Sequence, residues 1–396
     1  MITEDLADYF VVKTLMGLED VLAKECETQN LGPVKKGVRA VIIPNNRESL
    51  IRANMSLRTA LRILIPLYSF DYSSEEEFYE RCLHYVWSQF IRPDDSFKIQ
   101  VSGQSLVAKH SGYLALKLKD ALCDQIKSQK GFRPTVDKIS PKWTIDVHLS
   151  GNKVDISLDS SGQPLFKRGW RSKHGKASVN EVLAAGIIFL TGWDSEKEDF
   201  YDLMCGSGTF LAEAAAIAAN YAPGLYGRAY NFFAFPGFDQ RTYQKVRRSL
   251  ASQKKEINVK IWGSDNDPVA IAHAHHNLAR AGFSKEVFIQ KMDIRKPSLN
   301  PSSGLILLNP PYEKRILTKN PDELYASIGR FLKKNCSGAR AAVFSGNFDA
   351  LKRIGLKPTQ SISLLNGAMP CKLVLYELFK GKRKNYLQLK HEKRAL

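Results

Sequence analysis

The chain has 396 residues, and its 44% hydrophobic content is enough to build two or three ordinary globular domains. Lys and Arg outnumber Asp and Glu by 58 to 40, which gives a formal net charge of +18. This excess predicts a polyanionic partner held through its phosphates, and we expect that partner to be a nucleic acid. An inert basic surface and a membrane-surface protein remain alternatives, although no amphipathic basic helix stands out.

Two further features bound the class of protein. The first residues, Met1 to Asp5, are acidic where a signal peptide would be basic, and the best apolar run, 182–193, is too short to span a bilayer. The six cysteines lie far apart and form no C-x-x-C pair, so we expect reduced thiols and no zinc site. We therefore expect a soluble cytoplasmic protein without a structural metal.

The first part of the chain mixes short strand and helix patterns. Ser150-Gly151-Asn152 joins two strand-like runs and predicts a hairpin. Many lysines but no cluster of catalytic residue types occur here, so this part is expected to bind rather than catalyse. The predicted strands are 9–12, 38–43, 97–101, 144–149 and 153–158, the predicted helices are 18–26, 78–90 and 112–127, and 57–67 has a helix-to-strand pattern.

A dense basic run follows, at the expected boundary between the two parts of the chain. No acid interrupts residues 165–177, Trp170 lies among the cations, and a helix is predicted to start near Ser178. A solvated face and a phosphate-binding segment are equally good interpretations. The residues predicted to contact RNA are Lys167, Arg168, Trp170, Arg171 and Lys173.

The second part alternates strand and helix patterns, which predicts a parallel, doubly wound sheet with its site at the carboxyl ends of the strands. Two late strands joined around Asn366-Gly367 predict an antiparallel edge hairpin, and the aromatic-rich insertion 221–255 is either local packing or a lid. The predicted strands are 200–201, 260–262, 287–290, 305–308, 340–344, 361–365 and 373–379, and the predicted helices are 209–220, 269–281 and 323–333.

A glycine-rich loop lies between the strand at 200–201 and the helix at 209–220. Its glycines allow close approach of a ligand to the backbone, and the helix start offers free N–H groups. The dinucleotide pattern G-x-G-x-x-G fails because Leu211 stands at the third glycine position. An acid before the glycines suits an ammonium group better than a pyrophosphate. The residues of this candidate ligand loop are Asp202, Cys205, Gly206, Ser207, Gly208 and Thr209.

Acids also follow the next two predicted strands. Asp265 and Asp267 come after the strand at 260–262, where a carboxylate can accept both hydroxyls of a ribose. Asp293 follows the strand at 287–290, where it can accept from the N6 amine of an adenine. Asp265 and Asp293 can also be simple helix caps. Ammonium, ribose and adenine, met in this order, describe S-adenosylmethionine.

The apolar strand at 305–308 leads directly into Asn309-Pro310-Pro311-Tyr312, where we place the chemistry. Asn309 brings a carbonyl acceptor, the prolines stiffen the backbone, and Tyr312 offers a flat ring with a polar tip. Such a pocket can accept hydrogen bonds from an exocyclic amine while the ring stacks on the base. A proline-stiffened loop without function is the alternative.

These motifs, in this order, resemble the class I S-adenosylmethionine-dependent methyltransferases that act on exocyclic amines of bases. Two further segments, 167–171 with 177–185 and Tyr9 to Glu25, resemble the THUMP-domain RNA methyltransferases, which include guanine-N2 enzymes of bacterial 23S ribosomal RNA and of transfer RNA. In this family Ser178 is usually a proline. Proteins of this kind are also often labelled adenine-N6 DNA methylases, because N-P-P-Y is shared with those enzymes.

The resemblance implies a Rossmann-like methyltransferase domain at 164–380. Before it stand a ferredoxin-like subdomain at 1–66 and a THUMP RNA-binding domain at 67–163, and a basic tail follows at 381–396. The glycine loop, Asp265, Asp267, Asp293, Asn309 and Ser178 would contact the cofactor. Asn309 and the Pro310 carbonyl would accept the amine hydrogens while Tyr312 stacks on a base turned out of its helix.

The expected reaction is in-line transfer of a methyl group to a guanine N2 amine, with ribosomal RNA as the first substrate and transfer RNA as the second. Because a ring-attached amine is a weak nucleophile, positioning is expected to supply most of the rate. Adenine-N6 methylation is the alternative within enzymes. An RNA-binding assembly factor with a vestigial methyltransferase fold is the alternative outside them.

Overall fold

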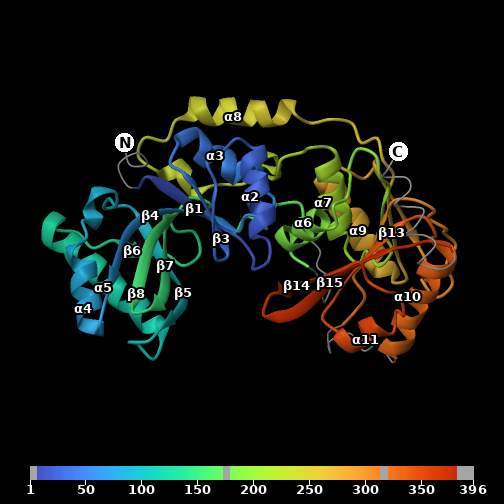
Figure 1. Ribbon diagram of the computed structural model, residues 1–396. Helices are drawn as coiled ribbons and strands as arrows, with labels where there is room; N and C mark the ends of the chain where they lie inside the picture. The colour runs from blue at the N-terminus through green and yellow to red at the C-terminus, as the bar shows by residue number, and fades with distance from the viewer. Residues whose placement is uncertain (1–6, 173–178, 313–319, 381–396) are drawn as a thin grey trace. The chain divides into compact units, whose positions relative to one another are not determined.

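The computed structural model describes residues 7–172, 179–312 and 320–380, which fold into two compact units (Figure 1). The first unit holds the chain up to Thr14, Leu22–Leu165 and Gly227–Ser249, and the second holds Leu15–Val21, Phe166–Tyr226 and the chain from Leu250 onward. The two units differ from the expected domain limits in two main respects. Leu15–Val21 lies within the expected ferredoxin-like subdomain but belongs to the second unit. Residues 227–249 lie within the expected methyltransferase segment but fold with the first unit.

One mixed sheet of eight strands forms the first unit, in the order β2-β3-β1-β4-β8-β7-β5-β6. The strand β4 (Arg62–Asp71) joins its two halves, pairing with β1 on one side and β8 on the other, with a bulge between Pro66 and Tyr68. The predicted hairpin is confirmed as β7 and β8. The other strands are β1 (Tyr9–Lys13), β2 (Lys35–Gly37), β3 (Ala40–Pro44), β5 (Ser96–Ser105), β6 (Thr135–Val136), β7 (Trp143–Gly151) and β8 (Lys153–Asp159).

Four helices lie between strands of this sheet in chain order, and one of them has no counterpart in the predicted pattern. That helix is α3 (Arg47–Ser56), which begins at Asn46, whose Oδ1 accepts hydrogen bonds from the backbone N–H groups of Glu48 and Ser49. An asparagine followed by an acid is a recognisable helix start, but it stands in a short segment between strands. The others are α2 (Glu19–Thr28), α4 (Glu75–His84) and α5 (Ser111–Lys130), with a 3₁₀ turn η1 at Trp87–Gln89.

The aromatic-rich insertion packs within the first unit. The ring of Phe235 stacks on Trp143 of β7, with ring centroids 5.4 Å apart and an interplanar angle of 9°. Tyr230 stacks on Phe232, which is buried. Of the two interpretations, local packing therefore describes these side chains. The insertion contains the 3₁₀ turns η2 (Pro223–Tyr226) and η3 (Asn231–Ala234) and leads into α8 (Gln240–Ser252).

The second unit has the predicted doubly wound sheet, in the order β11-β10-β9-β12-β13-β15-β14. The first five strands run parallel, and β15 pairs antiparallel with both β13 and β14, which confirms the edge hairpin. Because β9, β10, β11 and β12 run in the same direction, their carboxyl ends lie at one edge of the sheet. The strands are β9 (Phe200–Asp202), β10 (Ile261–Asp265), β11 (Val287–Lys291), β12 (Leu305–Leu308), β13 (Arg340–Ser345), β14 (Gln360–Asn366) and β15 (Met369–Glu377).

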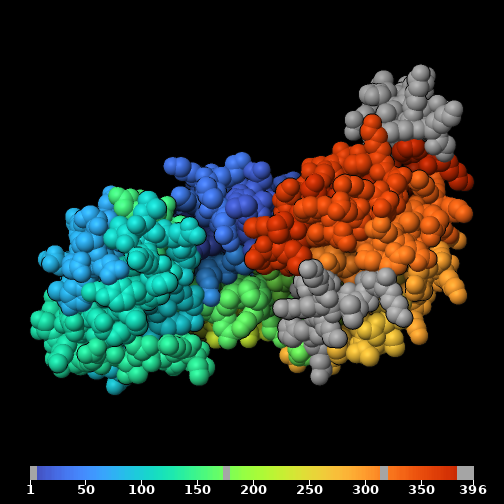
Figure 2. Space-filling model, turned by 90° about the horizontal axis from the view of Figure 1, so that it is seen from below, coloured from blue at the N-terminus to red at the C-terminus, as the bar shows by residue number. Residues whose placement is uncertain are grey.

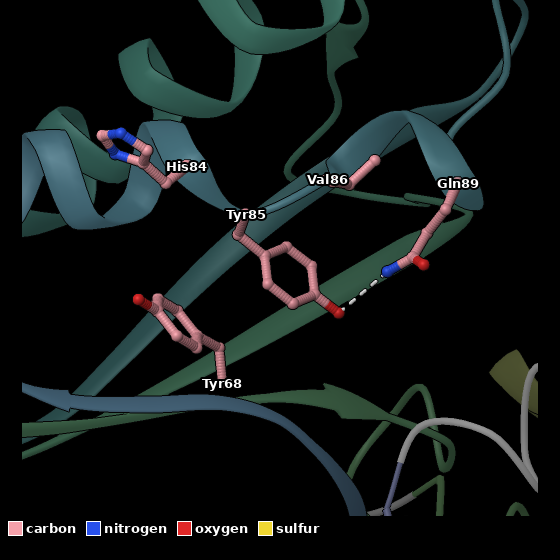
Figure 3. A pocket seen from close by; sticks show the side chains of 5 residues that line it. All are labelled: Tyr68, His84, Tyr85, Val86 and Gln89. Carbon is pink, nitrogen blue, oxygen red and sulfur yellow. Dashed lines mark hydrogen bonds between the residues drawn. The ribbon is translucent and has the colours of Figure 1, made fainter.

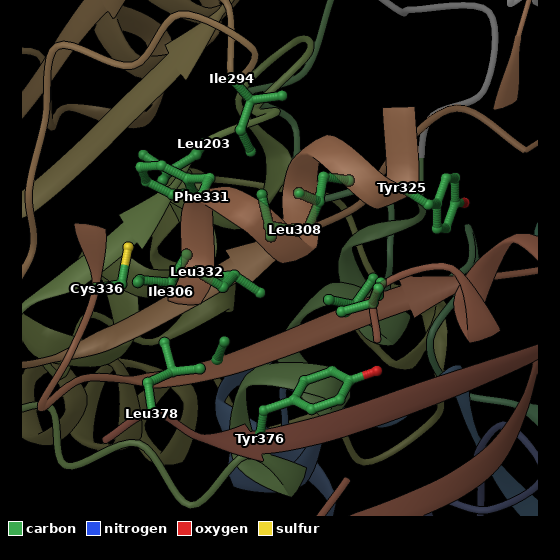
Figure 4. Close-up of a cluster of buried hydrophobic side chains, with 14 of the residues drawn as sticks. Leu203, Ile294, Ile306, Leu308, Tyr325, Phe331, Leu332, Cys336, Tyr376 and Leu378 are labelled. Atoms are coloured by element: carbon green, nitrogen blue, oxygen red, sulfur yellow. The ribbon is translucent and has the colours of Figure 1, made fainter. Parts of the chain in front are cut away.

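Helices cover both faces of this sheet (Figure 1). On one face α10 packs its apolar side onto the strands, where Phe331 and Leu332 meet Ile306 and Leu308 (Figure 4). The helices α7 and α9 contact β9, β10 and β11. No helix in the described parts of the chain is long and apolar enough to cross a bilayer. The helices are α6 (Glu181–Leu190), α7 (Thr209–Ala218), α9 (Pro268–Ala281), α10 (Pro321–Asn335) and α11 (Phe348–Lys352).

Helix α10 approaches the backbone after α11 so closely that one of its positions admits no side chain. A Cβ on Gly329 would lie 2.0 Å from the backbone oxygen of Ile354. That carbonyl belongs to a packed turn and cannot rotate away as a side chain would. Gly329 is therefore a packing residue in the middle of a helix, where glycine is otherwise unfavourable.

We predict that Gly329→Ala lowers the midpoint of thermal unfolding, although alanine is the better helix former by about 1 kcal/mol. The clash must move α10 away from the sheet, and overpacking of this kind costs about 1–3 kcal/mol. Gly112→Ala in α5 is the matched control, because a Cβ there meets nothing within 4 Å. Equal or raised stability in Gly329→Ala would contradict this packing.

Candidate active site

The candidate residues gather where four adjacent parallel strands end. Asp202 is the last residue of β9, Asp265 is the last of β10, Asp293 follows β11, and Asn309 follows β12. Because these strands are neighbours in the order β11-β10-β9-β12, their ends form one continuous edge. The structure thus brings together the acids that the sequence places after separate strands.

Asp202 is the most unusual group at this edge. Its side chain is fully buried, and neither carboxylate oxygen has a hydrogen-bond partner. Desolvation raises the pKa of this carboxyl well above its usual range; the nearby Met204 backbone N–H opposes that rise, and the charge of Asp265 adds to it. A buried polar group without a partner is costly. The site can therefore accept an ammonium or another strong donor here.

The glycine loop is held by its own backbone and by α9. The Cys205 N–H donates to the Ser264 carbonyl, and the Gly208 N–H donates to the Cys205 carbonyl. Gly208 has φ of 81°, and a Cβ there would lie 3.1 Å from the Cβ of Ala274 in α9. The close approach of α9 to the loop therefore requires a glycine at this position. Gly206 has φ of 52° and open space where a Cβ would be. A ligand can therefore approach the backbone of Gly206 without meeting a side chain there.

The remaining loop side chains are buried. Cys205, Ser207 and Thr209 are each at most 6% exposed. Burial first, and then the charges of Asp202 and Asp265, raises the pKa of the Cys205 thiol well above its usual range, so it stays a neutral thiol. These residues shape the loop, and their backbone groups are the part that can face a ligand.

The acid that ends β10 and the acid that follows it have different surroundings. Asp265 accepts hydrogen bonds from the Gly206 N–H at 2.9 Å and the Asp267 N–H at 3.0 Å, and burial raises its pKa. Its carboxylate therefore ties the glycine loop to the end of β10 and keeps further acceptor capacity. Asp267 caps α9 by accepting from the Val269 N–H at 2.9 Å. The helix-cap alternative thus describes Asp267 rather than Asp265.

Asp293 is paired with Arg295. The Arg295 Nε donates to Asp293 Oδ1 at 2.9 Å and to Oδ2 at 3.0 Å, and the backbone N–H of Arg295 also donates to Oδ1. These hydrogen bonds lower the pKa of Asp293, so it is ionised at neutral pH. A ligand amine at this position would share an acceptor that already binds a guanidinium.

Asn309 carries the second unsatisfied acceptor of the site. Its Oδ1 atom is buried and has no hydrogen-bond partner. It follows the fully buried Leu308, and Pro310 next to it is also buried. Because a proline cannot donate from its nitrogen and holds φ near −65°, the turn is stiff, and its two prolines add carbonyl acceptors but no N–H donors. Such a turn can receive the hydrogens of an amine.

Three residues from other elements hold the ring of Tyr312. Asn366 Nδ2 donates to the Tyr312 hydroxyl at 3.0 Å, and Phe344 meets the ring edge-on at 6.2 Å between centroids. A Cβ on Gly346 would lie 2.9 Å from Tyr312 Cδ2 and 2.9 Å from Met369 Sδ. The ring therefore lies in a fitted slot at the end of β13, beside the β14–β15 turn.

The basic run predicted to contact RNA is largely an internal element, and three of its predicted contacts are wrong. Arg168 is 1% exposed and pairs with Glu213 of α7, and Trp170 is 2% exposed. Arg171 pairs with Glu181 of α6 at 3.6 Å. Buried cations paired with acids cannot reach a phosphate. Lys167 is exposed and stays a predicted contact, whereas Lys173 and Ser178 lie outside the described residues.

Three supporting residues were missed in the sequence. Asn277 of α9 is fully buried, and its Nδ2 donates to the Ser207 carbonyl at 3.0 Å, which fixes the glycine loop. Gly346 and Asn366 hold Tyr312. A polar residue on the apolar side of the predicted helix at 269–281 was the signal for Asn277. Nothing in the sequence pointed to Gly346, because its role depends on a ring far away in the chain.

A separate recess lies in the first unit. It has a volume of about 290 Å³ and is lined by Tyr68, His84, Tyr85, Val86 and Gln89 (Figure 3). Gln89 Nε2 donates to the Tyr85 hydroxyl at 3.0 Å, and the Tyr68 and Tyr85 rings stack with centroids 5.6 Å apart. Across the described residues no group of three or more metal-ligating side chains gathers.

Comparison with known families divides the chain as follows. Residues 168–374 match the family described as RMKL-like, methyltransferase domain. Residues 72–159 match the THUMP domain, and residues 9–64 match the RlmL ferredoxin-like domain.

Two curated relatives match nearly the whole chain. "Putative RNA methyltransferase slr0064" of Synechocystis is 33% identical over 368 residues, which are 92% of this chain and 95% of that protein. "Ribosomal RNA large subunit methyltransferase K/L" of Pseudomonas putida is 32% identical over 378 residues, or 91% of this chain. The chain spans about half the length of the K/L proteins, since it covers 51% of this one.

A solved structure has the same fold. SMU.472, described as "a putative methyltransferase complexed with SAH", is 26% identical, covers 94% of this chain and 99% of its own, and superposes with a TM-score of 0.83. The matched family spans more than half of this chain, and the Synechocystis relative is matched over nearly its full length. The chain therefore belongs to the RMKL-like methyltransferase family.

Proposed function

We propose that this protein transfers a methyl group from S-adenosylmethionine to the exocyclic N2 amine of a guanine in RNA, with ribosomal RNA as the substrate. The observation that carries the proposal is the pair of buried, unsatisfied acceptors, Asp202 and Asn309 Oδ1, on neighbouring strands β9 and β12. One suits the ammonium of the donor, and the other suits the amine that is methylated. The Pseudomonas relative is named for ribosomal RNA, which supports the choice of substrate.

The residues at the strand ends fit the cofactor. When bound, S-adenosylmethionine supplies an activated methyl group on a sulfonium. Asp202 would accept from its ammonium, which satisfies the buried carboxylate. Asp265 holds the Gly206 N–H and keeps acceptor capacity for ribose hydroxyls. Asp293 and the backbone at Gly206 and Gly208 would complete the binding site, so the chain's part is to orient the methyl group.

The residues after β12 fit the acceptor base. Asn309 Oδ1 and the Pro310 carbonyl would accept the two hydrogens of the amine and point its lone pair at the methyl group. Pro311 keeps this turn rigid. Tyr312 would stack on the base, and its ring is already oriented by Asn366, Phe344 and Gly346. Positioning supplies the rate because the ring-attached amine needs alignment more than deprotonation.

RNA would be held by the first unit and by the general positive charge. The THUMP match at residues 72–159 supports RNA as the partner, with transfer RNA as the second candidate. Exposed Lys167 would contact phosphate. The recess with Tyr68 and Tyr85 offers stacking surface for an unpaired base.

Transfer of tritiated methyl from S-adenosylmethionine to ribosomal RNA that lacks this modification tests the proposal. Digestion of the product and mass spectrometry should identify N2-methylguanosine. N6-methyladenosine as the product would instead support adenine methylation, and methylation of duplex DNA but of no RNA would overturn RNA as the substrate. Failure to bind S-adenosylmethionine at all would leave an assembly factor with a vestigial fold.

We predict that Asn309→Ala lowers kcat for methyl transfer by about 100-fold or more, because misplacing the amine costs a factor of this size. Affinity for S-adenosylhomocysteine, measured by calorimetry, should change little. Asn46→Ala is the control, because Asn46 caps α3 in the first unit and its loss should keep most of the activity. Full activity in Asn309→Ala would contradict the role given to its side chain.

A second prediction concerns Asp202 and pH. Because burial raises its pKa, the free protein keeps this carboxyl neutral to a higher pH than an unfolded chain does. Binding an ammonium needs the carboxylate, so affinity for S-adenosylhomocysteine should rise with pH until Asp202 has ionised, and then level off. Asp202→Asn should weaken binding by about 10- to 100-fold, the value of a hydrogen bond to a charge, and should lose this pH dependence.

The same variant has an opposite effect on stability. Above the ordinary pKa of an aspartate, the unfolded chain releases a proton that the folded chain retains, so burial of Asp202 costs stability as pH rises. Asn cannot ionise, and Asp202→Asn should raise the unfolding midpoint of the cofactor-free protein at neutral pH. A variant that is both less stable and unaltered in affinity would contradict the account.

A third prediction tests the hold on Tyr312. Asn366→Ala and Tyr312→Phe each remove the same hydrogen bond, worth about 0.5–1.5 kcal/mol, and should each lower kcat by a few-fold. The double variant should be no worse than the worse of the two single variants. Losses that multiply instead would show that Asn366 does not act through the Tyr312 hydroxyl.

A further inference from the structure

Two side chains near Tyr312 remain without a part in the proposed reaction. Phe348, the first residue of α11, is 39% exposed, which is unusual for a large apolar ring next to a packed strand end. Lys372 of β15 places its Nζ over this ring, 5.0 Å from the centroid. No carboxylate pairs with Lys372 among the residues that the structure describes.

Both side chains lie beside the slot that holds Tyr312. Gly346, whose missing Cβ makes room for the Tyr312 ring, stands two residues before Phe348. Lys372 is the cross-strand partner of Ser345, the residue before Gly346. Two residues of chain span at most about 7 Å, so Phe348 lies at most about 7 Å along the chain from Gly346, which contacts the Tyr312 ring. This is about the distance between neighbouring nucleotides of a single strand. The segments α10 to β15 form a broad exposed surface (Figure 2).

The local structure keeps this pair in place. Asn347 caps α11 by accepting from the Ala350 N–H at 3.0 Å, and the Asn347 N–H donates to Ser345 Oγ at 3.0 Å. Ser345 is fully buried and bonds to the Tyr325 hydroxyl at 2.6 Å. The backbone that presents Phe348 is therefore tied to the core, so the exposed ring stands on a rigid support.

An exposed ring and an ammonium that pairs with no described carboxylate are complementary to one kind of ligand on this surface. A nucleobase stacks on the face of an aromatic ring, and its phosphate attracts a lysine; together these contacts hold single-stranded RNA without reading its sequence. We propose that Phe348 and Lys372 bind the nucleotide next to the target guanine, with the base on the Phe348 ring and the phosphate at Lys372 Nζ. This rests on the proposed function, because it places the target base at Tyr312.

Such a site has a role in the reaction. A base turned out of its helix leaves a neighbour that has lost its stacking partner, and unstacking costs a few kcal/mol. Stacking on Phe348 restores part of that loss, and Lys372 holds the strand in register. The pair would lower KM for RNA and leave the methyl-transfer step to Asn309 and Tyr312.

Binding of a short, fluorescein-labelled single-stranded RNA, followed by anisotropy, tests the inference directly. Phe348→Ala should weaken binding by about tenfold, within the range for one stacked base. Phe348→Tyr should bind as the unchanged protein does, and Phe348→Leu should be as weak as the alanine variant, because it keeps apolar bulk but has no ring face. Equal affinity of the leucine variant and the unchanged protein would overturn stacking.

Lys372→Ala gives an independent test that does not depend on Phe348. Losing one phosphate contact should reduce the slope of log affinity against log salt by about one. Lys352→Ala is the matched control, since Lys352 stands on α11 with Phe348 but pairs with Asp349. An unchanged slope in Lys372→Ala, or an equal change in both variants, would overturn the phosphate contact.

Two further measurements separate this inference from the proposed function. Affinity for S-adenosylhomocysteine and the identity of the methylated nucleoside should be the same in every Phe348 and Lys372 variant, while KM for RNA rises in Phe348→Ala, Phe348→Leu and Lys372→Ala and stays unchanged in Phe348→Tyr. If RNA binding is unaltered but N2-methylguanosine still forms, the neighbouring-nucleotide site is wrong and the function stands. If the product is not a methylated guanine, the function is wrong whatever these variants bind.

Discussion

The structure depends on one constraint, a carboxylate buried without a partner at the end of a central strand. Asp202 closes β9, the middle of the five parallel strands, and its side chain is fully buried directly before the glycine loop. Such a group destabilises the free protein, so its position must be held by the rest of the fold. Asp265, Asn277 and the close contact of Gly208 with Ala274 fix the loop around it.

A second unsatisfied acceptor lies directly after the next strand, and the proposed reaction rests on the two together. Asn309 Oδ1 belongs to a turn that two prolines make rigid, while Tyr312 beside it is fixed by contacts from β13 and from the β14–β15 turn. The second unit therefore contains two buried acceptors that lower its stability and one aromatic ring that is held rigidly in place. The proposed transfer between two bound groups would need this combination, because alignment rather than acid–base strength would limit its rate.

Much of this could be predicted from the sequence, because the relevant signals are local. The strand and helix periods gave the parallel sheet and the edge hairpin, and acids directly after strands gave the position of Asp202, Asp265 and Asp293. What failed depends on distant partners. Arg168 and Arg171 look like exposed cations until Glu213 and Glu181 are placed beside them, and Trp170 is buried. The insertion at 227–249 could not be assigned to the first unit, because Trp143 is far away in the chain.

Calorimetry of S-adenosylhomocysteine binding in buffers of different ionisation enthalpy tests the central claim most directly. If the neutral carboxyl of Asp202 must ionise to receive the ammonium, binding will release a proton at pH values below its raised pKa. The released proton should disappear in Asp202→Asn. If the unchanged protein and Asp202→Asn bind S-adenosylhomocysteine equally tightly, and neither exchanges a proton at any pH, the claim that this buried carboxylate holds the cofactor is contradicted.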